Sequence, residues 1–492
     1  MVMSARSGKR SPGGRRSAQY LLGACAAVAL SACDGDSSST SYGGSAQKYG
    51  LSGTVSGLNG SGLVLSVDGS TQAVASGAKE VVLGASLPAG TAYTVRVATQ
   101  PSAESCTVAN GTGTMPASAV TDVAVSCSPN LESVLYSFAG VQSGGKFTGA
   151  ALIQGSDGSF YGTTFGGGAN GDGTVFKITP AGAEMLLYSF TGAHGDGANP
   201  NAALIQGSDG NLYGTTWDGG ANNDGAVFKI TPAGVETVLH SLSGSPGDGM
   251  SPNASLVQGS DGNFYSTTAR GGAIGDGTVF KITPTGVETV LYSFGGTPDE
   301  ANPLAALVQG SDGNLYGTTW DGGANGEGMV FSITPAGVET VLYSFGATKT
   351  DGTGPQATLI QDSDGNFLGT TPSGGANGDG TVFKVTPAGV ETVLYSFGAS
   401  QSDGTYAEAS LIQGSDGNFY GTTSTGGANG DGTVFRITPA GVETVVYSFA
   451  GGPTDGANPN AALIQGSDGN FYGTTVSGGV NGDGVVFKIL AQ

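Results

Sequence analysis

The chain has 492 residues, 91 of them glycine, and only 11% of its residues are charged. Its 20 phenylalanines and 17 tyrosines argue against disorder, and this helix-poor composition favours many short strands joined by tight turns. A net charge of −21 offers no basic surface that could neutralise a phosphate backbone, so we expect no nucleic-acid partner.

The first 32 residues have the pattern of an export signal. Five basic residues and no acidic ones precede an apolar stretch, residues 20–32, which is too short to remain in a bilayer as a helix. The stretch runs into residues 30–33 (LSAC), which resemble the lipobox of bacterial lipoprotein signal peptides. The resemblance implies a lipid on Cys33 and a membrane-anchored, extracytoplasmic protein of the bacterial cell envelope. The alternative is an ordinary secretory signal that is cleaved nearby.

A tether and a small domain follow. Residues 33–47 are rich in serine and glycine, which predicts a flexible linker. Residues 48–130 contain short alternating segments, such as 63–67, separated by turn signals such as Asn59-Gly60, and this pattern predicts a β-sandwich. Cys106 and Cys127 remain after the signal, and in an oxidising compartment we expect them to form one disulfide. This domain could be a spacer or a binding domain.

Residues 131–492 form a tandem repeat. The tripeptide Tyr-Ser-Phe recurs at intervals of about 52 residues, and His240 replaces its tyrosine once. Each unit has four short apolar segments, joined by a Ser-Asp-Gly turn, a glycine-rich loop and a Pro-x-Gly turn. Because such turns connect antiparallel strands, each unit is predicted to be a four-stranded antiparallel sheet.

The two ends of the repeat are out of phase. The array opens with a lone fourth segment, residues 132–138, and closes with a third segment, residues 485–490. Pairing these segments would complete the last sheet and remove an exposed edge. We therefore predict an all-β chain: a seven-bladed β-propeller with N-terminal strand closure, preceded by the small disulfide-linked β-sandwich.

The repeated sequence, read as ALIQGSDGNFYGTT, then GGANGDGTVFKITPAGVETVLYSF, resembles the GloVer tandem repeat of bacterial exported proteins. The resemblance covers residues 131–492 in seven copies. It implies a propeller-like extracytoplasmic protein with a surface anchor, and it carries no known activity. The turns also resemble those of streptogramin lyases, but the recurrent catalytic histidine of that family is lacking.

Charged residues recur at two strand positions. A basic residue occupies one place in the third strand, and a glutamate begins the fourth. We expect the hairpin to place them opposite each other as structural ion pairs. The basic residues are Lys177, Lys229, Lys281, Lys384, Arg436 and Lys488, and the glutamates are Glu132, Glu184, Glu236, Glu288, Glu339, Glu391 and Glu443.

An acidic residue also recurs in each loop between the second and third strands. Asp-Gly is common in turns, so the acids can be explained by turn formation alone. The functional alternative is a ring of carboxylates that collects Ca²⁺ or a cationic partner, and Ca²⁺ is the cofactor we consider. These candidate loop residues are Asp172, Asp224, Asp276, Glu327, Asp379, Asp431 and Asp483.

Trp217 and Trp320 each end a second strand, in the sequence TTWDGG. Tryptophan beside aspartate suits stacking on a sugar and hydrogen bonding to its hydroxyls, and packing at the rim is the alternative.

The sequence thus predicts a binding or interaction scaffold for a glycan or protein ligand, with no catalytic residue assigned. The alternatives are an envelope polysaccharide lyase or hydrolase that uses loop carboxylates, and a purely structural surface protein.

Residues that depart from the repeat separate these hypotheses. Convergence near the axis would favour an enzyme, and an exposed aromatic patch would favour binding. The departing residues are Lys146, Phe147, Arg270, Lys349 and Tyr406.

Overall fold

The structure is a computed structural model that describes residues 47–101, 104–129, 131–140, 144–193, 195–244, 246–296 and 301–491. This described part consists of strands, turns and loops without a helix. It accordingly contains no helix with the length and apolarity needed to cross a membrane. The predicted export signal, Cys33 and almost all of the predicted tether lie outside the described residues.

Two four-stranded sheets form the N-terminal part, with strand orders β4-β1-β8-β6 and β3-β2-β5-β7. Side chains alternate between the two faces of a strand, and one face of each sheet contributes to a shared core that includes Leu51, Leu65 and Val123. The predicted disulfide is confirmed: Cys106 and Cys127 lie opposite each other on β6 and β8 and are bonded. The strands are β1 (Lys48–Ser56), β2 (Val64–Val67), β3 (Ser70–Ala73), β4 (Glu80–Pro88), β5 (Ala92–Thr99), β6 (Glu104–Ala109), β7 (Thr112–Thr114) and β8 (Val120–Pro129).

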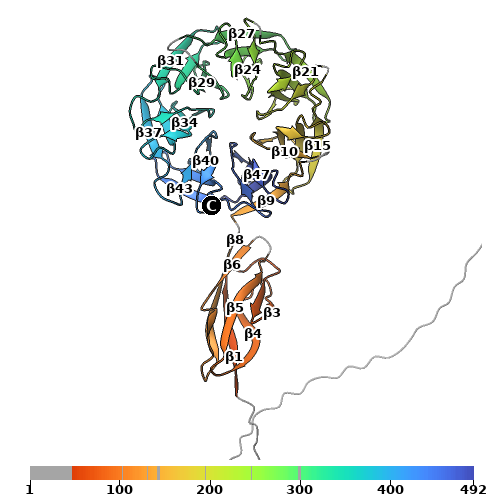
Figure 1. Cartoon of the computed structure of the whole chain (residues 1–492), viewed down its shortest axis with the longest axis vertical. Helices are drawn as coiled ribbons and strands as arrows, with labels where there is room; N and C mark the ends of the chain where they lie inside the picture. Colours follow the sequence, from red (N-terminus) through yellow and green to blue (C-terminus); the bar gives the residue numbers. More distant parts are fainter. Residues whose placement is uncertain are drawn as a thin grey trace, which may run out of the picture.

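Seven further four-stranded sheets lie side by side in a ring within the described residues (Figure 1). The first consists of β11 (Ile153–Gln154), β12 (Phe160–Thr164), β14 (Thr174–Ile178) and β15 (Glu184–Ser189), all antiparallel. The innermost strand, β11, has only two residues. The outermost strand lies at the rim of the ring (Figure 1).

The other sheets repeat this order. Their strands are β17 (Ile205–Gln206), β18 (Leu212–Thr216), β20 (Ala226–Ile230), β21 (Glu236–Ser241); β23 (Val257–Gln258), β24 (Phe264–Thr268), β26 (Thr278–Ile282), β27 (Glu288–Ser293); β28 (Val308–Gln309), β29 (Leu315–Thr319), β30 (Met329–Ile333), β31 (Glu339–Ser344); β33 (Ile360–Gln361), β34 (Phe367–Thr371), β36 (Thr381–Val385), β37 (Glu391–Ser396); β39 (Ile412–Gln413), β40 (Phe419–Thr423), β42 (Thr433–Ile437), β43 (Glu443–Ser448); and β45 (Ile464–Gln465), β46 (Phe471–Thr475), β48 (Val485–Ile489), β9 (Glu132–Ser137).

Apolar side chains hold neighbouring sheets together. One core cluster joins Tyr161 and Phe190 of the first sheet to Leu212 and Phe228 of the second. The rings of Phe190 and Phe228 meet edge to face, with centroids 5.1 Å apart. A single sheet therefore cannot bury its apolar face alone, and burial requires the next sheet in the ring.

Hydrogen bonds between neighbouring sheets recur in the same way. Thr163 Oγ1 donates to the carbonyl of Ala202 in the following segment (3.1 Å), and the backbone N–H of Ser156 donates to Gln206 Oε1 (3.0 Å). The first threonine of each Thr-Thr pair thus serves the structure.

The ring closes where its two ends meet. β9 pairs antiparallel with β48, and Glu132 lies opposite Ile489. The hydrogen bond from Thr474 Oγ1 to the carbonyl of Ala150 (3.0 Å) repeats the bond found between the other sheets. The predicted pairing of residues 132–138 with residues 485–490 is confirmed.

The predicted ion pairs between the third and fourth strands are wrong. Lys177 lies opposite Met185, whereas Glu184 lies opposite Ile178. Because consecutive side chains of a strand point to opposite faces, this offset of one residue separates the two charges. Lys177 Nζ instead contacts Asp157 Oδ2 at 2.6 Å, and Lys488 makes the equivalent contact with Asp468 at 2.9 Å.

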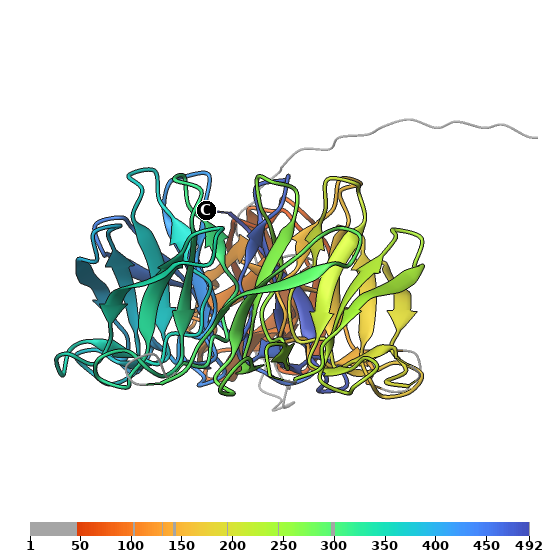
Figure 2. The ribbon, with the colours of Figure 1, turned by 90° about the horizontal axis from the view of Figure 1, so that it is seen from above.

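The longer loops form one end of the ring and the short turns the other, as the side view in Figure 2 shows. Two-stranded ladders join the long loops of a unit. In each ladder the loop that follows the second strand pairs with the loop that precedes the first strand of the same sheet. The ladders are β10 (Gly145–Lys146) with β13 (Gly166–Gly167), β16 (Gly197–Ala198) with β19 (Asp218–Gly219), β22 (Gly249–Met250) with β25 (Arg270–Gly271), β32 (Gly352–Thr353) with β35 (Ser373–Gly374), β38 (Gly404–Thr405) with β41 (Thr425–Gly426), and β44 (Gly456–Ala457) with β47 (Ser477–Gly478).

Candidate ligand-binding site

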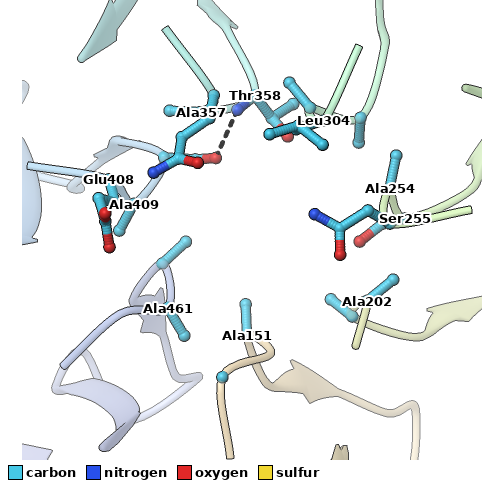
Figure 3. Close-up of a pocket in the computed structure, with 18 of the residues that line it drawn as sticks. Ala151, Ala202, Ala254, Ser255, Leu304, Ala357, Thr358, Glu408, Ala409 and Ala461 are labelled. Atoms are coloured by element: carbon cyan, nitrogen blue, oxygen red, sulfur yellow. Dashed lines mark hydrogen bonds between the residues drawn. The ribbon is translucent and has the colours of Figure 1, made fainter. Parts of the chain in front are cut away.

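A central channel of about 180 Å³ lies where the segments before the inner strands meet. Half of its lining residues are alanine; Ala151, Ala202 and Ala461 are among the residues around the open centre in Figure 3. Small side chains keep the channel open. Glu408 is the one charged residue of this described lining.

Glu408 stands where other units have asparagine, glycine, leucine or glutamine. Burial raises the pKa of its carboxyl, and a hydrogen bond with Gln356 opposes that shift. The channel thus has a polar side formed by Glu408 and Gln356, both contributed by units that depart from the repeat.

A second depression, of about 400 Å³, adjoins the channel on the long-loop end. Leu304 and Gln356 belong to the lining of both cavities. We call this depression the tryptophan groove. Its lining consists of Trp217, Ala269, Arg270, Asn302, Leu304, Trp320, Asp321 and Gln356.

The two tryptophans come from sheets that are not neighbours. Trp217 follows β18 and its backbone N–H donates to Asn199 O (3.1 Å), whereas Trp320 follows β29 and donates to Asn302 O (3.0 Å). Both side chains are half-buried. The Trp320 ring lies against Gly354, where an added Cβ would meet ring atoms at 3.5 Å. Gly354 also has a φ of +63°, which favours glycine, so the ring has a flat backbone surface beneath it.

Polar groups lie in the same groove. Arg270 begins β25, in the loop after β24 of the sheet that lies between those of the two tryptophans, and its side chain is exposed. Asn302 Nδ2 donates to Asp321 Oδ2 at 2.9 Å, which orients both groups. Two indole rings, a guanidinium, a carboxylate and two amides therefore converge in one depression.

Two further aromatic side chains are exposed at this end of the ring. Phe147 is 44% exposed and Tyr406 is 48% exposed. Both have a positive φ, +60° and +59°, at a position where other units have Asn199, Ser251 or Gly354. A bulky residue in the left-handed region is strained, and such strain is often found at functional sites. Lys146 Nζ lies 5.3 Å from the centre of the Phe147 ring.

The acidic ring predicted from the sequence does not assemble into a metal site in the described residues. Six of the seven acids accept a hydrogen bond at the backbone carbonyl from the next loop, as Asp172 does from Asn199 (2.7 Å). Only His240, Asp248 and Glu288 bring three ligand atoms together in the described part of the chain. The loop acids Asp224, Asp276, Glu327, Asp379, Asp431 and Asp483 are outside that group.

Sequence reasoning identified Trp217, Trp320 and Arg270, and also the aspartate beside each tryptophan, which includes Asp321. Among the other polar lining residues it missed Asn302, Gln356 and Glu408. Gln356 and Glu408 depart from the repeat, because the usual Asn-Pro-Asn-Ala becomes GPQA at 354–357 and YAEA at 406–409, and comparing the units position by position would have revealed them. Asn302 keeps the usual asparagine, so the sequence carries no such signal for it.

These features define an all-β repeat protein with a propeller-like ring of sheets and a ligand-sized groove at one end. The chain belongs to the Gloeobacter/Verrucomicrobia repeat family, whose model matches residues 100–310 and 296–487. The resemblance inferred from the repeated sequence is thereby confirmed. No curated protein matches the chain.

Three solved structures are similar to parts of this chain. The extracellular domain of a hybrid two-component system from B. thetaiotaomicron is 14% identical, with a TM-score of 0.50, over 80% of this chain and 44% of that one. The extracellular domain of a one-component system from the same organism is 9% identical, with a TM-score of 0.46, over 71% and 39%. A Bacteroides uniformis protein described as a 6-phosphogluconolactonase is 16% identical, with a TM-score of 0.41, over 62% and 84%. The chain spans less than half the length of the first two, and these identities concern the fold alone.

Proposed function

We propose that this chain is an extracytoplasmic binding protein. In this proposal residues 131–492 are a closed seven-bladed β-propeller, and residues 48–130 are a disulfide-linked β-sandwich. The seven repeated sheets and the pairing of β9 with β48 support the propeller. The lipobox-like residues 30–33 support removal of residues 1–32 and lipid anchoring in the cell envelope through Cys33 and the tether 33–47. The extracellular location of the domain with a similar fold agrees with this address.

The ligand we propose is an oligosaccharide bound in the tryptophan groove. The observation that carries the proposal is that the only two tryptophans of the chain meet in one depression although they come from separate sheets. Indole rings stack on the apolar face of a sugar ring, and Asn302, Asp321 and Gln356 supply hydrogen bonds for its hydroxyls. The groove volume of about 400 Å³ falls within the range of about 300–1,000 Å³ typical of ligand sites.

The groove offers its own optical test. Because both tryptophans line it, the fluorescence of the full chain reports on the groove during titration with a panel of oligosaccharides. We expect saturable quenching by one class of sugar, and at least about tenfold weaker binding in Trp217→Ala and in Trp320→Ala, measured by calorimetry.

Phe165→Ala is the matched control, because Phe165 follows its strand at the position that Trp217 occupies in the next unit. It should bind the sugar with unchanged affinity. Sugar affinity equal to that of the native chain in both tryptophan variants, or no binding to any sugar of the panel, would reject the groove as the site.

Glu408 favours a second function, glycan cleavage. A half-buried carboxyl with a raised pKa is suited to act as a general acid. Hydrolysis uses a second carboxyl, and Asp321 is the one that lines the adjoining groove. Product analysis of a bound oligosaccharide tests this alternative: turnover by the native chain that is lost in Glu408→Gln, with binding retained, would establish it.

The lipid anchor is tested separately. Expression of the full chain in a bacterial host with radiolabelled palmitate should label the native protein and leave Cys33→Ser unlabelled and released from the membrane. Label retained by Cys33→Ser would refute lipidation at this residue.

A further inference from the structure

The outer edges of neighbouring sheets meet in a repeated polar seam. In each such seam the tyrosine of the outermost strand donates to an aspartate in the loop that follows, and the first glutamate of the next sheet lies beside them. The Tyr–Asp distances are 2.8–3.0 Å in four seams of the described residues. These seams are Tyr188–Asp196–Glu236, Tyr343–Asp351–Glu391, Tyr395–Asp403–Glu443 and Tyr447–Asp455–Glu132.

One seam has histidine instead of tyrosine. His240 on β21 faces Asp248 in the following loop, with 3.7 Å between His240 Nε2 and Asp248 Oδ2. Glu288, the first residue of β27, completes the seam from the next sheet. The three ligand atoms lie within 4.8 Å of one another, and no other group of three occurs in the described residues.

Beside a glutamate Oε1 that lacks a hydrogen bond in the tyrosine seams as well, the histidine seam has a buried imidazole nitrogen without one. His240 Nε2 and Glu288 Oε1 are buried and make no hydrogen bond. Asp248, by contrast, is held in place: Ser243 donates to its Oδ2 through the backbone N–H (2.9 Å) and the hydroxyl (2.8 Å), and Gly249 N–H donates to its Oδ1 (2.7 Å). A fixed carboxylate therefore lies beside an imidazole nitrogen that lacks a hydrogen bond.

We propose that this seam binds one divalent transition-metal ion of the Zn²⁺ class through His240 Nε2 and one carboxylate oxygen each from Asp248 and Glu288. Imidazole and carboxylate are ligands that Zn²⁺ accepts at about 2.0–2.2 Å, so that its ligand atoms lie roughly 3–4 Å apart. The 3.7 Å separation of His240 and Asp248 falls in this range.

The surroundings suit a cation of this kind. The His240 and Asp248 side chains are 26% and 17% exposed, so solvent reaches part of both, whereas the atoms His240 Nε2 and Glu288 Oε1 are themselves buried. The chain has a net charge of −21, which attracts cations. An imidazole ligand favours Zn²⁺ over Ca²⁺, which prefers oxygen ligands.

The ion would join two sheets that both contribute to the tryptophan groove. His240 lies on β21, in the sheet whose strand β18 precedes Trp217, and Asp248 lies in the loop that follows β21. Glu288 begins β27 of the next sheet, whose strand β24 precedes Arg270. The metal site itself does not depend on the proposed oligosaccharide.

The chain provides a matched control for the test. His240→Tyr converts this seam to the sequence of the other four, so the variant is expected to fold. Untagged full chain is treated with chelator and titrated with ZnCl2 by calorimetry. We expect one site per chain in the native protein, at least about 100-fold weaker binding in His240→Tyr, and a clear loss in Glu288→Gln.

Further measurements decide whether the histidine seam is the place where Zn²⁺ binds. His194→Ala removes the other histidine of the chain and should leave Zn²⁺ binding unchanged. CoCl2 should give a visible absorption band in the native protein that His240→Tyr lacks. The proposal is overturned if native and His240→Tyr chains bind Zn²⁺ equally, if no single saturable site appears, or if CaCl2 competes with Zn²⁺ at the same concentration.

Discussion

The two ends of the ring use the same residue types for different purposes. At the short-turn end, Asp209 accepts hydrogen bonds from the backbone of Asn211 (3.0 Å) and the hydroxyl of Tyr213 (2.8 Å), and the same bonds recur in other sheets. At the long-loop end, Trp217, Arg270 and Glu408 each occupy a position at which the neighbouring units have a different residue type. Repetition therefore marks the residues that build the ring, and departure from the repeat marks those that can bind a ligand.

The largest expected effect comes from breaking a repeated contact in the core. Phe228→Ala removes a fully buried ring that packs between two sheets, and should lower the free energy of unfolding by about 3–5 kcal/mol. Phe147→Ala, at an exposed departing position, should change it by no more than about 0.5 kcal/mol. Urea denaturation of both variants measures the difference, and similar losses would contradict the comparison.

The seams between sheets predict a dependence of stability on pH. Burial first, and a neighbouring aspartate second, raise the pKa of Glu236, Glu391 and Glu443 to about 7 and that of Glu132 to about 8, from an ordinary value of 4.5. The folded chain therefore keeps protons that the unfolded chain has already lost. The contribution of these glutamates to the free energy of unfolding should be fully present below about pH 4.5, and it should be lost as the pH rises to about 8.

Calorimetry in chelator at pH 5 and pH 8 measures this effect. We expect a melting temperature lower at pH 8 by on the order of 5 °C. Glu236→Gln, which stays neutral, should reduce the difference. A higher melting temperature at pH 8 than at pH 5 would show that these glutamates are ionised in the folded chain.

A smaller effect separates the two rings of acids. Asp209→Ala removes charged hydrogen bonds at the short-turn end and should cost about 1–2 kcal/mol. Asp224→Ala, at the long-loop end, keeps the backbone carbonyl that accepts from Ser251 N–H and should cost less than about 0.5 kcal/mol. Equal losses of unfolding free energy in the two variants, measured by urea denaturation, would mean that both aspartates stabilise the ring to the same extent.

The smallest expected effect is a gain. Phe147→Asn places at the left-handed position the residue that Asn199 and Asn458 provide in other units. Asparagine tolerates this backbone better than phenylalanine, so the variant should be more stable by about 0.5 kcal/mol. Thermal unfolding checks the gain, and a loss would show that the Phe147 side chain contributes to packing after all.

Sequence periodicity predicted much of the fold because its determinants are local. The turns at Asp209-Gly210 and Pro232-Ala233-Gly234 specify hairpins within one unit, and the unpaired segments at the two ends predicted the pairing of β9 with β48. The pairing of Lys177 with Glu184 failed because it depends on a register of one residue, which the sequence pattern does not specify.

The sequence by itself determined the repeated sheet and the family, since both follow from residues that recur at fixed spacing along the chain. It also determined the disulfide partners, since only two cysteines follow the predicted signal and Cys33. Only the tertiary structure decided which residues of different sheets meet. The groove unites Trp217 with Trp320, and the histidine seam unites His240 with Glu288, across separate sheets. The curvature of the ring places these residues together, and curvature arises from packing between sheets rather than from the pattern within any one of them.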